Sequence, residues 1–296
     1  MSAIFLFLVL FILLFFPLVT YALFWYEAGN SPYRFQIQQE SDGKMVAWIL
    51  KGLFSSFWSQ ILVILLFPFG IFRPLWKTGA EENSTFPPVV LIHGLYHNAS
   101  AWFLFRFRLR RAGLKRIHVI SYSSWRHSFR EIEEQLVLRL MEIGAIEKDD
   151  PVLLVGHSLG GLLAKAYAGR KGGFPGPAVK GLITLGTPFR GSKMAAFALG
   201  KLARSLSSGS DLIKELEAID VPSHTACANL YSPVDNMVLP PESLAAAPEN
   251  WIQEKTAPIS HVTCLYHKPT FNQVFRLLSR FAGNSFKNSE ETREVL

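Results

Sequence analysis

The chain has 296 residues, 49% hydrophobic and only 18% charged, with 24 phenylalanines and a formal net charge of +7. This length allows one large α/β domain with additional elements, and the composition is more apolar than that of an ordinary soluble domain. The positive charge fits either solubility or attraction to anionic lipid. No nucleic-acid-binding motif is present, so nucleic acid is excluded as an expected partner.

The first apolar segment covers residues 2–26 and contains no charged residue. About 20 residues of helix suffice to cross a bilayer core of roughly 30 Å, and Tyr21, Trp25 and Tyr26 stand where an interfacial aromatic belt is expected. A cleaved signal peptide is the alternative, but no lysine or arginine precedes the apolar core. We therefore expect an uncleaved membrane anchor.

A second uncharged segment, residues 52–72, lies between Lys51 and Arg73. Its serines make it less apolar, so a buried or interfacial helix is the alternative to a spanning one. The loop before it carries three basic residues and the flank after it two, which places the following domain outside the cytoplasm by a small margin. Residues 1–80 are thus expected to be an integral membrane anchor region, and residues 81–296 one globular domain.

From residue 89 onward, short β-branched apolar runs alternate with segments of helical spacing. A capping box formed by Ser128 and Glu131 opens the second of these helices. The rhythm predicts a mostly parallel sheet of about six strands with helices on both faces, in which ligands bind at the carboxyl ends of the strands. The expected strands are 89–94, 116–124, 151–156, 181–187, 226–232 and 251–257, and the expected helices 98–112, 128–143, 159–170 and 270–281.

The sequence VGHSLGG at 155–161 lies between an expected strand and an expected helix. A strand that turns directly into a helix strains the residue at the turn, and Gly156 and Gly160 would remove collisions on either side of Ser158. Such a turn raises the serine hydroxyl above the sheet, at the positive end of a helix. We predict that Ser158 is a catalytic nucleophile.

A serine nucleophile needs a base, and the base needs an orienting acid. Asp235 follows the strand expected at 226–232, and His261 lies between the last expected strand and the final helix. The chain order serine, acid, histidine suits this fold, so we predict Asp235 as the acid and His261 as the base. The other candidates for these two roles are Asp211, Asp220, His224 and His267.

Attack on a carbonyl creates an oxyanion, which needs N–H donors that are already in place. We predict the backbone N–H of Leu159, directly after the nucleophile, and that of Leu95, after the first strand. His93 and His97 belong to the same loop as Leu95 and are expected to make structural hydrogen bonds.

The two cysteines, Cys227 and Cys264, have no CxxC or Cys/His metal spacing. We therefore expect no metal site, and the chemistry above requires no cofactor. Two buried free thiols are expected, with a disulfide as the alternative, because sequence cannot place the two sulfur atoms together.

Several stretches resemble lipases and esterases of the α/β-hydrolase superfamily, above all bacterial triacylglycerol lipases. The similarity covers about residues 87–283 and leaves the first 80 unexplained. Phe189 departs from the family pattern, which usually has histidine there. The stretches that carry the resemblance are IHGLYH (92–97), GHSLGG (156–161), LGTPFRGS (185–192), SPVDNMV (232–238) and SHV (260–262).

The resemblance implies an α/β-hydrolase fold with a reduced sheet and a mobile lid at about residues 189–224. A plain surface helix packed on the core is the alternative to a lid that opens at a lipid surface. The residues expected to share one apolar helix face there are Met194, Phe197, Ala198, Leu202 and Leu206.

Together these features predict a membrane-anchored serine carboxylic-ester hydrolase that cleaves lipid or acyl esters through an acyl-enzyme. A phospholipase or lysophospholipase, or an acyltransferase in which an alcohol or amine replaces water, would use the same residues. A non-catalytic membrane scaffold is disfavoured by the complete set of serine, aspartate and histidine. The sequence leaves the oligomeric state open.

Overall fold

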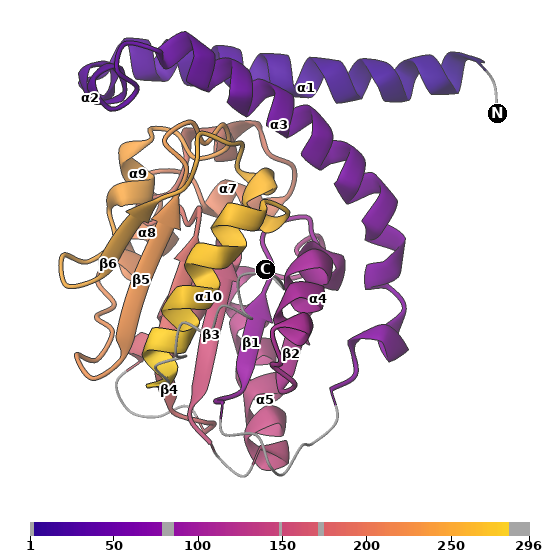
Figure 1. Ribbon diagram of the computed structural model, residues 1–296, viewed down its shortest axis with the longest axis vertical. Coiled ribbons are helices and arrows are strands. Elements are labelled where there is room, and N and C mark those ends of the chain that lie inside the picture. Colours follow the sequence, from indigo (N-terminus) through magenta and orange to yellow (C-terminus); the bar gives the residue numbers. More distant parts are fainter. Residues whose placement is uncertain (1–2, 79–85, 148–149, 171–174, 284–296) are drawn as a thin grey trace.

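Figure 1 presents the computed structural model of the protein, which describes residues 3–78, 86–147, 150–170 and 175–283. Side chains are described from residue 11 onward. The first residue of the segment 2–26 and the expected boundary between residues 80 and 81 lie outside the described residues.

One sheet of six parallel strands forms the centre of the protein, in the order β2-β1-β3-β4-β5-β6. Every expected strand is confirmed, although the second ends at Ile120 rather than near residue 124. The strands are β1 (Val89–Ile92), β2 (Ile117–Ile120), β3 (Val152–His157), β4 (Val179–Leu185), β5 (Ala226–Tyr231) and β6 (Ile252–Lys255).

The four helices expected after residue 89 are present, with the Ser128–Glu131 capping box at the start of α5. The first opens with a 3-10 turn in which Asn98 Oδ1 accepts from the N–H of Ser100 at 2.9 Å. The α-helices are α1 (Ala3–Gly29), α2 (Tyr33–Glu40), α3 (Met45–Leu66), α4 (Phe103–Arg111), α5 (Phe129–Ile146), α6 (Leu159–Gly169), α7 (Lys201–Ser205), α8 (Asp211–Glu217), α9 (Glu242–Ala245) and α10 (Lys268–Ala282). The 3-10 helices are η1 (Phe67–Gly70), η2 (Arg73–Trp76), η3 (Ala99–Trp102), η4 (Lys193–Phe197) and η5 (Val262–Leu265).

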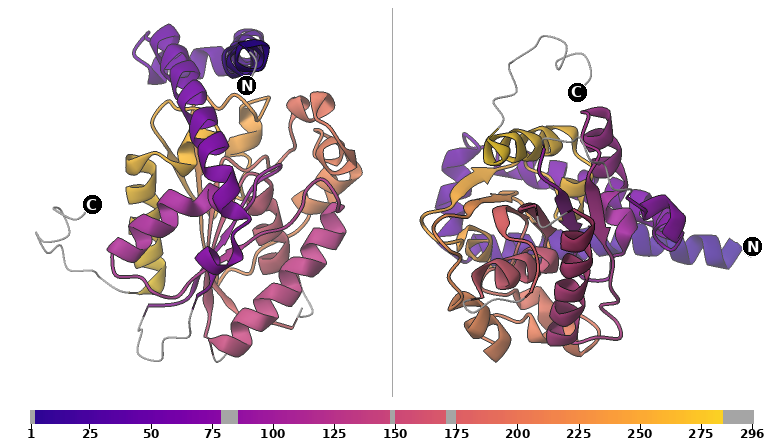
Figure 2. Two further views of the ribbon diagram at one scale, coloured as in Figure 1. Left: turned by 90° about the vertical axis from the view of Figure 1, so that its right-hand side faces the viewer. Right: turned by 90° about the horizontal axis from the view of Figure 1, so that it is seen from below.

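Helices cover both faces of the sheet (Figure 2), so the inner strands β1 and β3 are buried on both sides. Within β1, Val90 and Ile92 belong to a core shared with α5, α6 and α8, whereas Val89 and Leu91 belong to a second core shared with α4 and α10. Because β1 and β3 present side chains to both covered faces, each is almost a continuous apolar run, whereas the edge strand β6, IQEK, is polar and only half-buried.

The helices α1 and α3 lie across the carboxyl edge of the sheet (Figure 1). The spans Phe11–Gly29 and Met45–Gly70 are long and apolar enough to cross a membrane, and only 28% and 22% of their most apolar parts are buried. They are therefore unlike the core helices of a globular protein. A third apolar cluster joins this N-terminal region to the sheet domain and includes Phe24, Ile37 and Ile49 together with Val234.

The second apolar segment is a helix over different bounds from those expected. The sequence predicted residues 52–72 between Lys51 and Arg73, but α3 begins at Met45 and ends at Leu66, followed by η1. Lys51 therefore lies inside the helix, on an exposed position, because the apolar residues before it continue the same helical face.

The single amphipathic helix expected at 194–206 is wrong. Gly200, with φ +92°, interrupts the segment between η4 and α7. Leu202 and Leu206 are buried, whereas Phe197 is 74% exposed, so the expected residues do not share one face. A glycine outside helical backbone geometry divides the apolar pattern between two short elements.

Candidate active site

Ser158 stands at the sharp turn between β3 and α6, in strained backbone geometry. Its φ is +54° and its ψ −121°, a conformation that side-chain-bearing residues rarely adopt. The backbone N–H of Ser158 donates to Leu185 O at 2.8 Å, and its carbonyl accepts from Gly161 N at 2.9 Å. These bonds tie the turn to β4 and to the first turn of α6, so the strain is held by the surrounding structure.

The glycines around Ser158 occupy places that admit no side chain. A Cβ at Gly156 would lie 2.4 Å from Gly160 O, and one at Gly160 would lie 2.2 Å from Ile92 O. The turn therefore lets the start of α6 approach both its own strand and the end of β1.

His261 and Asp235 form a buried pair on the loops after β6 and β5. Nδ1 of His261 lies 2.7 Å from Asp235 Oδ2, and Asp235 is fully buried. The other carboxylate oxygen, Oδ1, accepts from the backbone N–H groups of Met237 at 2.9 Å and Val238 at 3.1 Å. With every partner of Asp235 a donor, the carboxylate holds the proton of the imidazole on Nδ1 and leaves Nε2 free to accept one.

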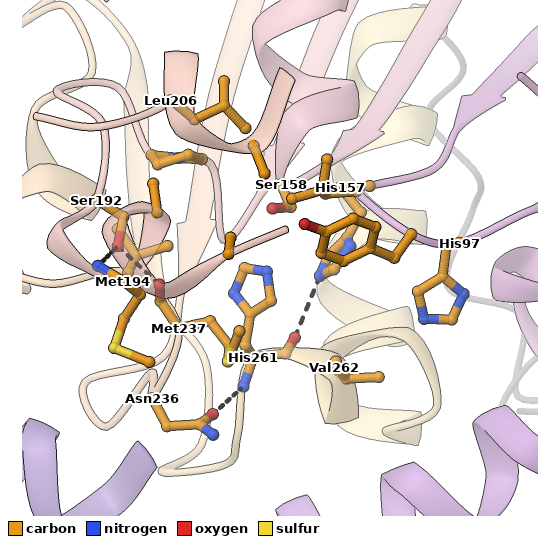
Figure 3. Close-up of a pocket in the computed structure, with 18 of the residues that line it drawn as sticks. His97, His157, Ser158, Ser192, Met194, Leu206, Asn236, Met237, His261 and Val262 are labelled. Carbon is orange, nitrogen blue, oxygen red and sulfur yellow. Dashed lines mark hydrogen bonds between the residues drawn. The ribbon is translucent and has the colours of Figure 1, made fainter. Parts of the chain in front are cut away.

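Ser158 and His261 line the same cavity of about 220 Å³, and Figure 3 shows the His261 ring pointing into it on the Ser158 side. Within the described residues no hydrogen bond joins the serine hydroxyl to the imidazole. Such contacts are often long before substrate binds and shorten in the complex, so this arrangement is compatible with proton transfer.

The buried side chain of His93 fixes the loop that contains Leu95. The ring of His93 stacks on Tyr122 at 4.1 Å; Nδ1 lies 2.8 Å from Gly94 O, and Nε2 accepts from Tyr122 N at 3.2 Å. Burial lowers the pKa of His93 to about 3, so the ring is neutral and Nδ1 carries the proton. This agrees with the expectation from sequence for His93, but not for His97, whose Nδ1 is buried without a hydrogen-bond partner among the described residues.

The backbone N–H groups of Leu95 and Leu159 have no acceptor among the described residues. Leu95 lines the cavity, and Leu159 is the first residue of α6, where an N–H has no partner within the helix. Both N–H groups are thus left without a protein acceptor in the described part of the chain. Tyr96, next to Leu95, has φ +60° and donates its N–H to Ser124 Oγ at 2.8 Å, which fixes the loop.

His157, the residue before the strained turn, lines the same cavity as His261. Its ring centroid lies 4.7 Å from that of His261, and its Nε2 lies 3.2 Å from the backbone carbonyl of His261. Burial, followed by the nearby charge of His261, lowers the pKa of His157 well below its usual value, so its ring is neutral. This neutral ring supports the base without placing a second charge beside it.

The alternative acids and bases lie elsewhere. Asp211 begins α8 on the surface, 3.7 Å from Lys214. The carbonyl of Asp220 lies beside Gly169, at the end of α6 far from Ser158. His224 is exposed before β5, and His267 contacts Thr270 at the start of α10 at 3.0 Å.

Two residues near the pair were not predicted from sequence. A Cβ at Gly186, where φ is +56°, would lie 3.1 Å from His261 Nδ1 and 3.3 Å from Asp235 Oδ2, so this glycine leaves room for the pair. Asn236 accepts from the N–H of His261 through Oδ1 at 3.2 Å. Gly186 stands in LGTPFRGS and Asn236 in SPVDNMV. Both residues therefore lay in motifs that the sequence analysis identified, but no role was predicted for them.

Cys227 and Cys264 are both buried and free, as expected. Burial raises the pKa of Cys227 to about 12 and that of Cys264 further, which keeps both thiols protonated and unreactive. Among the described residues, no three His, Cys, Asp or Glu side chains are grouped as a metal ion would require.

The arrangement of sheet, turn and loops agrees with what comparison with known proteins finds. The profile of the Alpha/beta hydrolase family matches residues 89–276. The chain belongs to this family. No curated protein matches the sequence.

Solved structures with the same fold include lipases at low sequence identity. The mature lipase BlEst2 of Bacillus licheniformis is 20% identical, with 69% of this chain and 96% of that chain covered and a TM-score of 0.56. The lin2722 product of Listeria innocua is 17% identical, with 66% and 94% covered and a TM-score of 0.53. Aspergillus fumigatus lipase B is 17% identical, with 69% and 54% covered and a TM-score of 0.52. These similarities establish the α/β-hydrolase fold, and the N-terminal helices precede the part that the family profile matches.

Proposed function

We propose that this α/β hydrolase is a membrane-anchored serine carboxylic-ester hydrolase that acts on lipid or acyl esters. The observation that supports it most is one cavity that contains Ser158 on its strained turn and the imidazole of the buried His261–Asp235 pair. A strained residue at a cavity wall persists only where the surrounding structure holds it, as the hydrogen bonds at 158 do here.

The proposed reaction has two halves that use the same groups. Ser158 Oγ attacks the ester carbonyl while Nε2 of His261 takes the hydroxyl proton, and the same nitrogen then protonates the departing alcohol. In the second half, water attacks the acyl-enzyme while Nε2 takes a proton from it. The same nitrogen then returns the proton to Ser158 Oγ as the carboxylic acid leaves. Asp235 keeps Nδ1 protonated and stabilises the imidazolium, and the N–H groups of Leu95 and Leu159 receive the oxyanion.

The lining of the cavity supports an apolar acyl group as the substrate part that it accepts. Small and apolar side chains of the segment 189–224 form one side, among them Met194, Ala198 and Leu206, and Ser56 and Ser59 of α3 form another. We also propose that this segment acts as a lid. Phe197 and Leu199 are 74% and 68% exposed on it, a pattern suited to contact with lipid.

The outward face of α3 supports insertion into lipid. Phe54, Trp58 and Leu65 are at least 62% exposed there, whereas Ser56 and Ser59, on the opposite face, are nearly fully buried. An apolar exterior around a polar, small-residue contact surface suits a helix in lipid better than one in water. By the balance of basic residues, we propose that the sheet domain lies on the extracytoplasmic side.

The test is an ester-hydrolysis assay of the full-length protein over acyl chain lengths, with acylglycerols, phospholipids and lysophospholipids, beside Ser158→Ala. We expect release of fatty acid that Ser158→Ala abolishes, and a fluorophosphonate adduct on Ser158. An adduct on a different residue, or hydrolysis that survives Ser158→Ala, would remove the proposal. Transfer of the acyl group to an added alcohol instead of water would reassign the protein as an acyltransferase. Vesicle flotation and protease protection test membrane insertion and orientation separately.

A further inference from the structure

The loop that presents Asp235 is held by α1 on both sides of that residue. The hydroxyl of Tyr21 donates to Val234 O at 3.0 Å, and Asn236 Nδ2 donates to Thr20 Oγ1 at 2.8 Å. All of these groups are buried. When one partner of a buried hydrogen bond is removed, the remaining polar group stays buried without a partner and costs the full free energy of its desolvation. These contacts therefore constrain the loop strongly.

The loop that presents His261 is held by α3 in the same way. Ser55 Oγ accepts from the N–H of Ser260 at 2.7 Å, and Ser55 O accepts from Thr263 Oγ1 at 2.8 Å. The residue before His261 and the residue two positions after it are therefore attached to a single residue of α3. Figure 1 shows why: the middle of α3 passes directly over the carboxyl edge of the sheet.

Asn236 connects the two loops to each other and to α1. Its Oδ1 accepts from the N–H of His261 at 3.2 Å, while its Nδ2 binds Thr20. The distance between Asp235 and His261 thus depends on a side chain whose orientation is set by Thr20.

We infer that α1 and α3 are positioning elements of the active site, which hold the loops of Asp235 and His261 through Thr20, Tyr21 and Ser55. This inference rests on the proposed function and adds to it. Beyond anchoring the chain, the N-terminal helices complete the catalytic arrangement, so the sheet domain matched by the family profile is not sufficient by itself.

The decisive experiment compares variants of the full-length protein in detergent micelles. Thr20→Val removes the acceptor with little change of shape, Thr20→Ser keeps it, and Ser55→Ala removes the acceptor for Ser260. For a soluble p-nitrophenyl butyrate substrate, we expect kcat to fall about tenfold in Thr20→Val and Ser55→Ala, with KM within about twofold. Thr20→Ser should keep kcat, because its hydroxyl takes over the contact with Asn236.

Ser41→Ala is the matched control, because it also removes the hydroxyl of a buried N-terminal residue, and among the described residues that hydroxyl binds only Gln38 O. Its kcat should equal that of the wild type. If Thr20→Val does not fold, Tyr21→Phe decides, with the exposed Tyr26→Phe as its control. Wild-type kcat in Ser55→Ala and in whichever of these α1 variants folds would overturn the inference.

Hydrogen exchange separates the failure of this inference from the failure of the proposed function. Amides of 232–238 and 259–264 should exchange faster in Thr20→Val and Ser55→Ala than in the wild type, whether or not the protein hydrolyses any ester. Unchanged exchange in both loops overturns the positioning role. If the two variants exchange faster but the wild-type protein hydrolyses no ester, the positioning role of α1 and α3 is retained and only the proposed hydrolase function is rejected.

Discussion

The two halves of this protein place their apolar side chains in opposite ways. In the sheet domain the strands β1 and β3 are buried along their whole length, and alternate residues enter the two cores. In α3 the large side chains Phe54 and Trp58 face outward, while Ser56 and Ser59 face the protein. Apolar residues therefore mark the core in the sheet domain but the outer surface in α3. The buried face of a segment has to be identified before the segment can be assigned to a core or to a membrane.

The largest expected effect lies in the sheet domain. Asp235→Asn should lower kcat about 10⁴-fold, because an amide that donates to Nδ1 would favour the wrong tautomer of His261. The folded structure should persist, since Asn keeps the shape and can still accept from Met237 and Val238. The check is kcat together with a thermal unfolding curve, and a loss of less than about tenfold would speak against Asp235 as the orienting acid.

The next effect concerns folding and separates two kinds of glycine. Gly160→Ala should destabilise the protein by about 3 kcal/mol or more, because its Cβ would meet the backbone oxygen of Ile92. Gly113→Ala, at a turn where φ is +90° but nothing lies within 4 Å, should cost only about 1 kcal/mol. Denaturant unfolding measures both, and equal losses would contradict the close approach at Gly160.

Acid should destabilise the sheet domain before the N-terminal helices, because all eight histidines follow residue 92. Burial lowers the pKa of His93 from 6.5 to about 3, so below pH 6.5 the unfolded chain binds a proton that the folded chain does not. The stabilisation by neutral His93, on the order of a few kcal/mol, is complete above pH 6.5 and is lost as the pH falls toward 3.

Hydrogen exchange against pH provides the measurement. Amides of β1 should lose protection between pH 6.5 and 4 while those of α3 keep it. His93→Gln, which has no titrating group, should flatten the dependence, and a dependence unchanged in that variant would assign the effect to other histidines.

The smallest effect belongs to the outward face of α3. Trp58→Ser should change the stability in detergent by less than about 0.5 kcal/mol, because the side chain is 62% exposed. It should nevertheless weaken partitioning into vesicles, as measured by flotation, since an apolar contact with lipid is lost. Tight vesicle binding that survives this change together with Phe54→Ser would mean that this face does not contact lipid.

The sequence was most informative where local chemistry is sufficient. Parallel strands must be apolar on both faces, so VVLI and PVLLVG were recognisable by themselves, and the glycines around Ser158 follow from the geometry of one turn. The pairing of Asp235 with His261 could be expected from their order and their places after strands, whereas their catalytic roles stay predictions. These predictions depend on residues close together in the chain.

The contacts of α1 and α3 with the site were beyond this reasoning. Ser55 and Ser260 are 205 residues apart, and Thr20 and Asn236 are 216 apart, so no local pattern joins them. One signal was present: Gly52, Ser55, Ser56 and Ser59 have helical spacing within an otherwise apolar segment and mark its buried face. The interruption at Gly200 was also visible as a glycine inside the expected lid helix, but helical spacing was given more weight.

Gly52 has a consequence for how the membrane would act on this enzyme. A Cβ there would lie 2.3 Å from the hydroxyl of Tyr21, so the missing side chain lets α1 and α3 cross closely enough for Tyr21 to reach Val234. In the proposed setting, a thicker or thinner bilayer changes the tilt of such helices at modest cost. Through the contact of Tyr21 with Val234, a change of tilt at the Gly52 crossing would shift the loop of Asp235. Turnover should therefore vary with the length of the surrounding lipid chains, even for a substrate dissolved in water.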